Sequence, residues 1–208
     1  MTRELATIVD FIRYGASRFA AAGLTFGHSY DNALDEATHL VLHVLHLPHD
    51  LAPAYGQARL VASERAAVLA LIERRVAGHE PVAYLTGEAW FAGLKFKSDA
   101  RALVPRSPIA ELIQAGFSPW LDERVIERAL DLCTGSGCIG LSLSKAWPLS
   151  EVILADISED ALDLARLNAS RLSANVKLLR SDLFEKITGS FDVIVANLPY
   201  IPSAELPT

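Results

Sequence analysis

The spacing of hydrophobic residues divides this chain into a helical front part and a back part in which short apolar runs alternate with helices. In the front part, apolar side chains recur every three or four residues, the period of an α-helix with one buried face. The pattern predicts helices over residues 4–23, 31–47 and 63–76, with Asp31 and Ser63 as N-caps. Three such helices predict a small bundle, which serves either as a docking surface for a macromolecule or only as a stably packed unit.

Proline and glycine then interrupt the helical pattern. Pro81 and Gly87 end the bundle, and residues 88–97 hold two short aromatic runs divided by a glycine, which predicts a β-hairpin. Beyond the hairpin, Ser107-Pro108 is typical of the cap and first turn of a helix. Arg106 precedes this cap, either as a solvent-facing side chain or as one that contacts a carboxylate and orders the rim of a site.

From Arg128 onward, apolar runs of strand length alternate with helical segments. A helix is predicted over 139–147, and a second one follows the N-cap Ser158. Repeated strand–helix units predict a parallel, doubly wound α/β sheet that binds its ligands at the carboxyl ends of the strands. The predicted strands are residues 129–133, 151–155, 176–180 and 191–196.

Composition narrows the class of protein. With 208 residues and 51% hydrophobic residues, the chain can bury a sizeable core, and its net charge of −6 does not favour direct nucleic-acid binding. Its two cysteines share one loop, which predicts reduced thiols rather than a disulfide framework. Because no apolar run has the length of a membrane span and the N-terminus does not resemble a signal peptide, the sequence predicts a cytoplasmic protein without a membrane partner.

Three histidines in the second predicted helix have a spacing that a metal ion could use. His39, His43 and His46 would share one helical face. No carboxylate or cysteine on that helix completes a ligand set, and leucines surround the histidines. The sequence therefore predicts a packed helix and no metal site.

A glycine-rich loop follows the first predicted strand of the sheet. Gly135-x-Gly137-x-x-Gly140 matches the dinucleotide-binding fingerprint, but Asp131 just before it would repel a pyrophosphate and attract the ammonium group of S-adenosylmethionine. A sulfonium cofactor is therefore favoured over a nicotinamide. Asp156 is predicted to bind the ribose hydroxyls, and Asp182 with Leu183 to bracket the adenine. The candidate cofactor residues are Asp131, Cys133, Thr134, Gly135, Ser136, Gly137, Asp156, Asp182, Leu183 and Asn197.

The turn Asn197-Leu198-Pro199-Tyr200 follows the last predicted strand and could seat a planar NH₂ group. The Asn197 side-chain oxygen and the Leu198 carbonyl can each accept one N–H, Pro199 stiffens the turn, and Tyr200 can lie against a flat amide or base. The alternative is a turn that only ends a strand. The candidate catalytic residues are Asn197, Pro199 and Tyr200, and the candidate substrate-binding residues are Asn197, Leu198, Pro199 and Tyr200. The turn resembles the Asn-Pro-Pro-Tyr signature of methyltransferases that modify amide or exocyclic amino nitrogens, with Leu198 in place of the first proline.

Taken together, the motifs resemble those of the protein glutamine N5-methyltransferases, which modify release factors and ribosomal proteins. Pro105-Arg106-Ser107-Pro108-Ile109 and the segment 11–19 resemble the branch that acts on large-subunit ribosomal protein three. The resemblance implies a class I S-adenosylmethionine-dependent methyltransferase with a Rossmann-like sheet, a helical substrate-docking domain over residues 1–86, and a hairpin linker with the methyltransferase domain over residues 87–208. The other motifs that carry it are Tyr84 to Gly87, Trp90 to Phe96, Asp131 to Gly137, Ala155 to Ser158, Ser181 to Phe184 and the Asn197 turn.

The implied reaction is N5-methylation of a glutamine in that ribosomal protein, before or during ribosome assembly. Three alternatives stay open: a release-factor glutamine methyltransferase, a ribosomal-RNA adenine N6-methyltransferase, whose motif Asn-Leu-Pro-Tyr also resembles, and an inactive binding module. The last one arises because the family's sheet has seven strands and only four are predicted here. We therefore expect a domain truncated after its fourth strand, poorly stable or covered by a partner along the exposed sheet edge.

Overall fold

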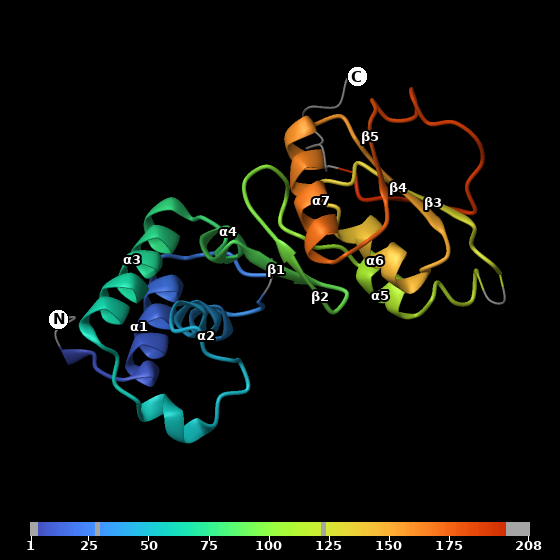
Figure 1. Ribbon diagram of the computed structural model, residues 1–208. Helices are drawn as coiled ribbons and strands as arrows, with labels where there is room; N and C mark the ends of the chain where they lie inside the picture. The colour runs from blue at the N-terminus through green and yellow to red at the C-terminus, as the bar shows by residue number, and fades with distance from the viewer. Residues whose placement is uncertain (1–3, 28–29, 122–123, 199–208) are drawn as a thin grey trace. The chain divides into compact units, whose positions relative to one another are not determined.

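The computed structural model describes residues 4–27, 30–121 and 124–198 (Figure 1). The chain divides into two compact units, Met1–Glu88 and Ala89–Thr208. The division falls at the start of the first strand of the hairpin. Each unit has its own hydrophobic core and is described by itself.

The first unit is the predicted helical bundle. Its core consists of large side chains with no solvent exposure, among them Phe11, Phe19 and Ile72. Thr7 begins the first helix with a capping box, because its side chain accepts from the Asp10 N–H and the Asp10 carboxylate accepts from the Thr7 N–H. The helices are α1 (Ile8–Ala21), α2 (Ala33–Val44), the 3₁₀-helix η2 (Pro53–Gln57), α3 (Ala62–Gly78) and α4 (Val82–Thr86).

Two of the predicted caps in the bundle are wrong by one or two residues. Asn32, not Asp31, caps α2, with its side-chain oxygen 2.9 Å from the Asp35 nitrogen. Ser63 lies inside α3, where Val61 occupies the N-cap position and its N–H donates to Glu64 at 2.8 Å. The Glu64 side chain satisfies a backbone donor at the helix start, so a hydroxyl cap is not required there.

His46 does not share the helical face of His39 and His43 as predicted, because α2 ends at Val44 and His46 lies beyond it with φ 55°. His39 is buried, and its Nδ1 lies 2.9 Å from Nε2 of His49. In the part of the chain that the structure describes, no group of three or more His, Cys, Asp or Glu could hold a metal ion.

The predicted hairpin consists of β1 (Glu88–Phe91) and β2 (Leu94–Lys97). Both turn residues, Ala92 and Gly93, have positive φ (48° and 79°), the geometry of a tight hairpin turn. Phe91 and Phe96 pack edge to face in the core of the second unit. The helix after the hairpin is α5 (Ile109–Gln114), and its N-cap is Pro108 rather than the predicted Ser107. The Ser107 hydroxyl still accepts from the Ile109 N–H at 3.3 Å.

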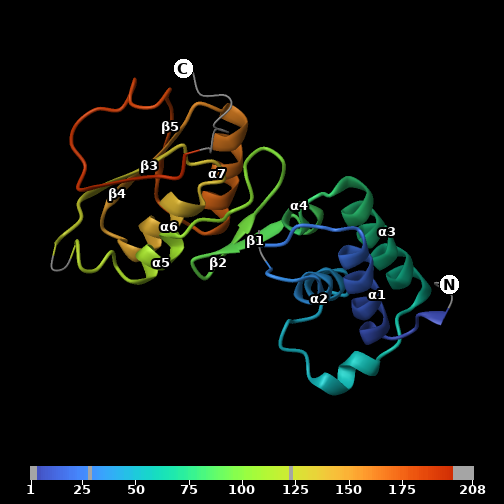
Figure 2. The ribbon, with the colours of Figure 1, turned by 180° about the vertical axis from the view of Figure 1, so that it is seen from behind.

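The sheet of the second unit is parallel, as predicted, with strand order β5-β4-β3-β6. Its strands are β3 (Arg128–Leu132), β4 (Glu151–Asp156), β5 (Lys177–Arg180) and β6 (Val193–Ala196), and its crossover helices are α6 (Cys138–Ala146) and α7 (Glu159–Arg171). Helices α5, α6 and α7 cover one face, seen from both sides in Figures 1 and 2. The opposite face, with Leu130 and Ala155, packs against Ile187 and Phe191 in the segment that returns the chain from β5 to β6.

The register of the sheet brings the predicted ligand-binding positions to one edge. Leu132 pairs with Ala155 on one side and with Ala196 on the other, and Asp156 pairs with Arg180. The strand order reverses between β3 and β6, which makes this edge the topological switch point where open α/β sheets bind ligands. Among the helices in the described ranges, none is long and apolar enough to cross a membrane.

Candidate cofactor and substrate site

The glycine-rich loop turns sharply between β3 and α6. Cys133, Gly135 and Gly137 all have positive φ (57°, 56° and 81°), and Gly137 occupies the N-cap position of α6. Backbone bonds fix the turn: the Thr134 N–H donates to the carbonyl of Ala155 at 3.0 Å, and the Gly137 N–H donates to the carbonyl of Thr134 at 2.9 Å. The loop thus points the start of α6 toward the switch point. Two of its three residues with positive φ are glycines, the residue type that adopts this conformation at the lowest cost.

Asp131 lies fully buried beneath this loop. Its Oδ2 accepts from the Thr134 hydroxyl at 2.5 Å and from the Gly140 N–H at 2.7 Å, while Oδ1 is buried without a partner among the described residues. Burial raises the pKa of this carboxyl to about 7, and the nearby Asp156 charge adds to the effect, against the opposing hydrogen bonds. Asp131 therefore holds the loop with one oxygen and keeps the other available for a donor, which fits a cationic cofactor group.

Gly140 allows α6 to approach the sheet closely. A Cβ atom at this position would lie 2.7 Å from Cδ1 of Leu154 and 2.9 Å from Cβ of Asp131, and Leu154 is itself fully buried and cannot move aside. The third glycine of the motif is thus required by helix–strand packing rather than by a positive φ.

We expect Gly140→Ala to destabilise the second unit by about 1–3 kcal/mol, because overpacking outweighs the roughly 1 kcal/mol that alanine gains over glycine in a helix. Chemical denaturation measures the effect. Lys145→Ala, an exposed change on the same helix, serves as the control and should shift stability by less than about 0.5 kcal/mol. A Gly140→Ala protein as stable as the parent would contradict the packing argument.

Asp156 ends β4 and supports the loop from the other side. Its Oδ2 accepts from the Gly135 N–H at 2.9 Å and its Oδ1 from the Ser158 N–H at 3.0 Å. Because each carboxylate oxygen can accept a second hydrogen bond, the half-buried side chain can also bind the hydroxyls of a ribose. Ser158 caps α7 as predicted, accepting from the Ala161 N–H at 3.3 Å.

The ends of β4 and β5 also carry exposed apolar side chains. Asp182 and Leu183 are both exposed, and Leu183 has φ 42°. Ile157 and Phe184, which the sequence reasoning gave no role, are 58% and 54% exposed. Large apolar residues within the first turn after a strand end are the signal that could have identified them. With Leu183 they offer apolar surface of the kind that a base covers.

Asn197 directly follows Ala196, the residue that pairs with Leu132 at the end of β3. The register therefore brings Asn197 beside the start of the glycine loop. Asn197 is half-buried and Leu198 is 49% exposed. Pro199 and Tyr200, the other members of the predicted amide seat, lie outside the described residues.

Other predicted residues have simpler surroundings. Cys133 and Cys138 are both free thiols, and burial raises the pKa of each, that of Cys138 to about 12, so neither is a ready nucleophile. Ser136 is buried within the loop. Arg106 is exposed, and the nearby Ala102 lies against the glycine loop, with its Cβ 3.6 Å from the place where a Gly135 Cβ would stand.

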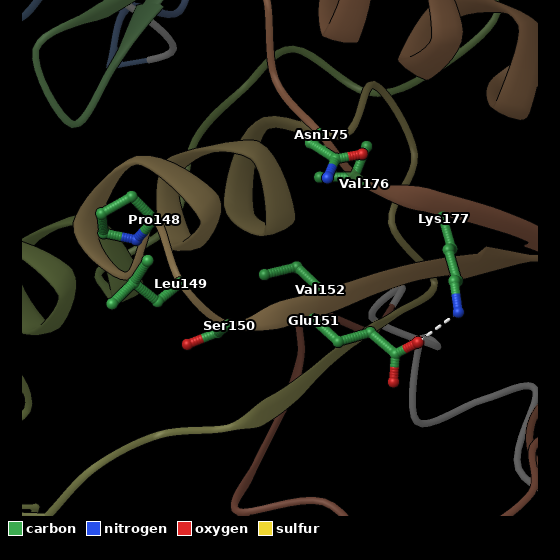
Figure 3. Close-up of a pocket in the computed structure, with 8 residues that line it drawn as sticks. All are labelled: Pro148, Leu149, Ser150, Glu151, Val152, Asn175, Val176 and Lys177. Atoms are coloured by element: carbon green, nitrogen blue, oxygen red, sulfur yellow. Dashed lines mark hydrogen bonds and ion pairs between the residues drawn. The ribbon is translucent and has the colours of Figure 1, made fainter.

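A pocket of about 280 Å³ lies at the other edge of the sheet (Figure 3). It is built from residues at the beginnings of β4 and β5, including Glu151 and its ion-pair partner Lys177. Since ligands of open α/β sheets bind at the carboxyl ends of the strands, this pocket is not part of the candidate site.

The chain is similar to methyltransferases over most of its length. Residues 117–206 match the Methyltransferase small domain, and residues 10–87 match the PrmC N-terminal domain. A crystal structure of a methyltransferase from Pyrococcus furiosus is 27% identical, covers 62% of this chain and 61% of its own, and has a TM-score of 0.44. The domain match and the parallel sheet confirm the predicted methyltransferase fold with a helical front part.

Two relatives share the name ribosomal protein uL3 glutamine methyltransferase. The one from Xanthomonas campestris pv. campestris is 67% identical over 97% of this chain, and the chain spans 66% of that relative's length. The one from Bordetella pertussis is 48% identical over 98% of this chain, which covers 70% of that relative. The predicted branch of the family is confirmed: the chain belongs to the family of ribosomal protein uL3 glutamine methyltransferases.

Proposed function

We propose that this chain takes part in the S-adenosylmethionine-dependent N5-methylation of a glutamine side chain in ribosomal protein uL3. The observation that carries the proposal is the high identity to relatives named for this reaction. The position of Asn197 beside the glycine loop supports it, because an acceptor of N–H groups then lies next to the proposed cofactor site. The release-factor, ribosomal-RNA and binding-module alternatives have no comparable support.

The residues at the sheet edge suit the proposed cofactor. The Oδ1 of Asp131, which has no hydrogen-bond partner among the residues that the structure describes, offers negative charge for the ammonium group. Asp156 offers acceptors for the ribose hydroxyls. The exposed apolar side chains Ile157, Leu183 and Phe184 offer surface for the adenine, and the glycine loop lets the backbone approach the ligand closely. When bound, S-adenosylmethionine supplies an electrophilic methyl group, which the amide nitrogen accepts as the carbon–sulfur bond breaks and a nitrogen-bound proton leaves.

The chain's own contribution to the reaction is positioning. A carboxamide nitrogen is a poor nucleophile because its lone pair is delocalised, so both of its N–H groups must be held. In the proposal, the side-chain oxygen of Asn197 accepts one N–H and the carbonyl of Leu198 accepts the other, which points the nitrogen toward the cofactor. Pro199 and Tyr200, the other predicted members of the seat, lie outside the described residues. No strong base is required before methyl transfer.

The helical unit Met1–Glu88 is proposed as the docking domain for uL3. It has a core of its own, and the hairpin that follows it joins the core of the second unit. We place the encounter in the cytoplasm, before or during ribosome assembly, when the glutamine is still accessible.

The proposal is tested by incubating the chain with S-adenosylmethionine labelled in its methyl group and with unmethylated ribosomes, free uL3, a release factor and ribosomal RNA in separate reactions. We expect label in uL3, located by peptide mass spectrometry on one glutamine that gains a single methyl group. Label in the release factor or in RNA would support the corresponding alternative. Cofactor binding without any transfer would support a binding module.

A further inference from the structure

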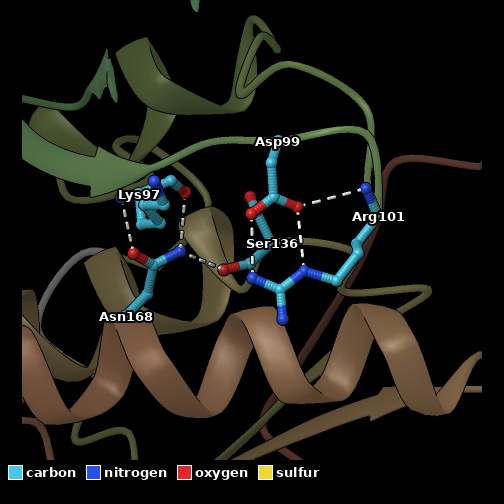
Figure 4. A network of polar contacts seen from close by, with 5 residues as sticks. All are labelled: Lys97, Asp99, Arg101, Ser136 and Asn168. Atoms are coloured by element: carbon cyan, nitrogen blue, oxygen red, sulfur yellow. Dashed lines mark hydrogen bonds and ion pairs between the residues drawn. The ribbon is translucent and has the colours of Figure 1, made fainter. Parts of the chain in front are cut away.

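Asn168 in α7 is a buried polar side chain that belongs to no predicted site. It is 1% exposed and makes hydrogen bonds to two segments far away in the sequence. Its Oδ1 accepts from the Lys97 N–H at 2.7 Å, and its Nδ2 donates to the Lys97 carbonyl at 3.1 Å and to the Ser136 carbonyl at 2.9 Å. Figure 4 shows the amide lying between these two segments. Burying an amide this completely is favourable only because its bonds are made.

The first of the two segments begins at the end of the hairpin and covers the glycine loop. Lys97 is the last residue of β2, and Ser98 after it is 1% exposed. Asp99 and Arg101 form a paired salt bridge that shapes the next residues (Figure 4), and Ala102 then lies against Gly135. By holding both backbone groups of Lys97, Asn168 fixes the point at which this covering segment starts.

The second segment is the glycine loop itself. The Ser136 carbonyl belongs to the peptide that leads into Gly137, which has φ 81° and begins α6. The acids Asp131 and Asp156 fix the loop at Thr134, Gly135 and Gly140. Asn168 thus orients the peptide between Ser136 and Gly137, which lies between the residues that the two acids hold.

We propose that Asn168 is a positioning residue that ties the glycine loop to the end of the hairpin, so that tight cofactor binding depends on where the hairpin lies. One amide holds both the loop and the segment that covers it. The inference rests on the proposed function, since it assumes that the loop binds S-adenosylmethionine. It makes the end of the hairpin, within the second unit, a support of the proposed cofactor site.

The test replaces Asn168 in the full chain and measures the Kd for S-adenosylhomocysteine by calorimetry. Asn168→Asp keeps the oxygen that accepts from Lys97, but it loses the two donated bonds and places a carboxylate against two carbonyl oxygens. Asn168→Ser removes the amide and its two donated bonds without adding charge, and it is used if the Asp variant does not fold. We expect the Kd to rise about 10- to 100-fold in either variant, the effect of leaving buried acceptors unpaired.

Leu162→Ala is the matched control, because Leu162 is also buried in α7 and its truncation leaves the Asn168 bonds in place. It should lower Tm at least as much as the Asn168 variants do while changing Kd less than about 3-fold. If Kd follows Tm in all variants alike, Asn168 has only a structural role and the proposal is overturned.

A second readout separates this inference from the proposed function. Hydrogen exchange of the Lys97 and Gly137 amides should accelerate together in the Asn168 variants and not in Leu162→Ala. If the parent chain itself does not bind S-adenosylhomocysteine, the proposed function fails at this site. Exchange that stays slow at either amide in the Asn168 variants would show that the tie does not exist.

Discussion

Replacing Asn197 by alanine is expected to slow glutamine methylation about 100- to 1,000-fold, the usual cost of losing a fixed hydrogen-bond group at a reacting centre. The variant loses the side-chain acceptor that would hold one N–H of the substrate amide, so the nitrogen is no longer pointed at the cofactor. The affinity for S-adenosylhomocysteine should change less than about 5-fold, because the acids that hold the loop lie on β3 and β4. Initial rates with uL3 and calorimetric titration of the same preparation measure the two quantities.

A control on the same strand distinguishes a local from a general effect. Ile194 is 50% exposed on β6 and faces away from the helix-covered core, so Ile194→Ala should keep both the rate and the affinity. Equal loss of rate and of cofactor affinity in Asn197→Ala would contradict a role in seating the amide. It would mean that Asn197 serves the cofactor or the fold.

The sheet and the loop could be predicted because their signals are local. An apolar run such as Val152 to Ala155, of strand length and rich in β-branched residues, indicates a buried strand, and closely spaced glycines at 135 and 137 mark a backbone turn of positive φ. Parallel pairing then brings the strand ends together whatever the intervening lengths. Asn197 could therefore be assigned to the ligand-binding edge from the sequence, whereas its place beside the loop follows from the pairing of β6 with β3.

The features that could not be predicted depend on contacts between distant parts of the chain. In the sequence, Asn168 looks like an ordinary polar residue of an amphipathic helix, but its hydrogen-bond partners Lys97 and Ser136 are 71 and 32 residues away. The histidines were misplaced because the end of α2 at Val44 has no proline or glycine to mark it. In both cases the tertiary environment, not the local sequence, determines the outcome.

Asp131 is more deeply buried than a residue predicted to contact the cofactor by its charge alone. The sequence suggested a charge that attracts the cofactor's ammonium group. The structure shows a carboxyl buried completely, with one oxygen bonded to the loop and the other without a partner in the described part of the chain. Asp131 thus has two roles: it supports the loop through hydrogen bonds, and it offers charge to the cofactor. A substitution that preserves its shape and removes its charge distinguishes the two roles.

Asp131→Asn is expected to raise stability and to weaken cofactor binding at the same time. Burial raises the pKa of Asp131 from 3.8 to about 7, so the folded chain binds the proton more tightly than the unfolded chain does. The contribution of Asp131 to the free energy of unfolding is therefore favourable at low pH and is lost as the pH rises from about 4 to about 7. The asparagine variant lacks this decline, so its stability relative to the parent should increase from about pH 4 to about pH 7 and be greatest above pH 7.

Cofactor affinity should change in the opposite direction, because the neutral amide cannot offer negative charge to the ammonium group. We expect a Kd for S-adenosylmethionine about 10- to 100-fold higher in Asp131→Asn at pH 8, as for the loss of a charged hydrogen-bond partner. In the parent chain the Kd should rise as the pH falls below about 7, since the carboxyl must then lose its proton before it can attract the cation. Denaturation and calorimetry across pH 5–8 measure both effects. A variant that gains stability but binds the cofactor as tightly as the parent would reduce Asp131 to a support for the loop.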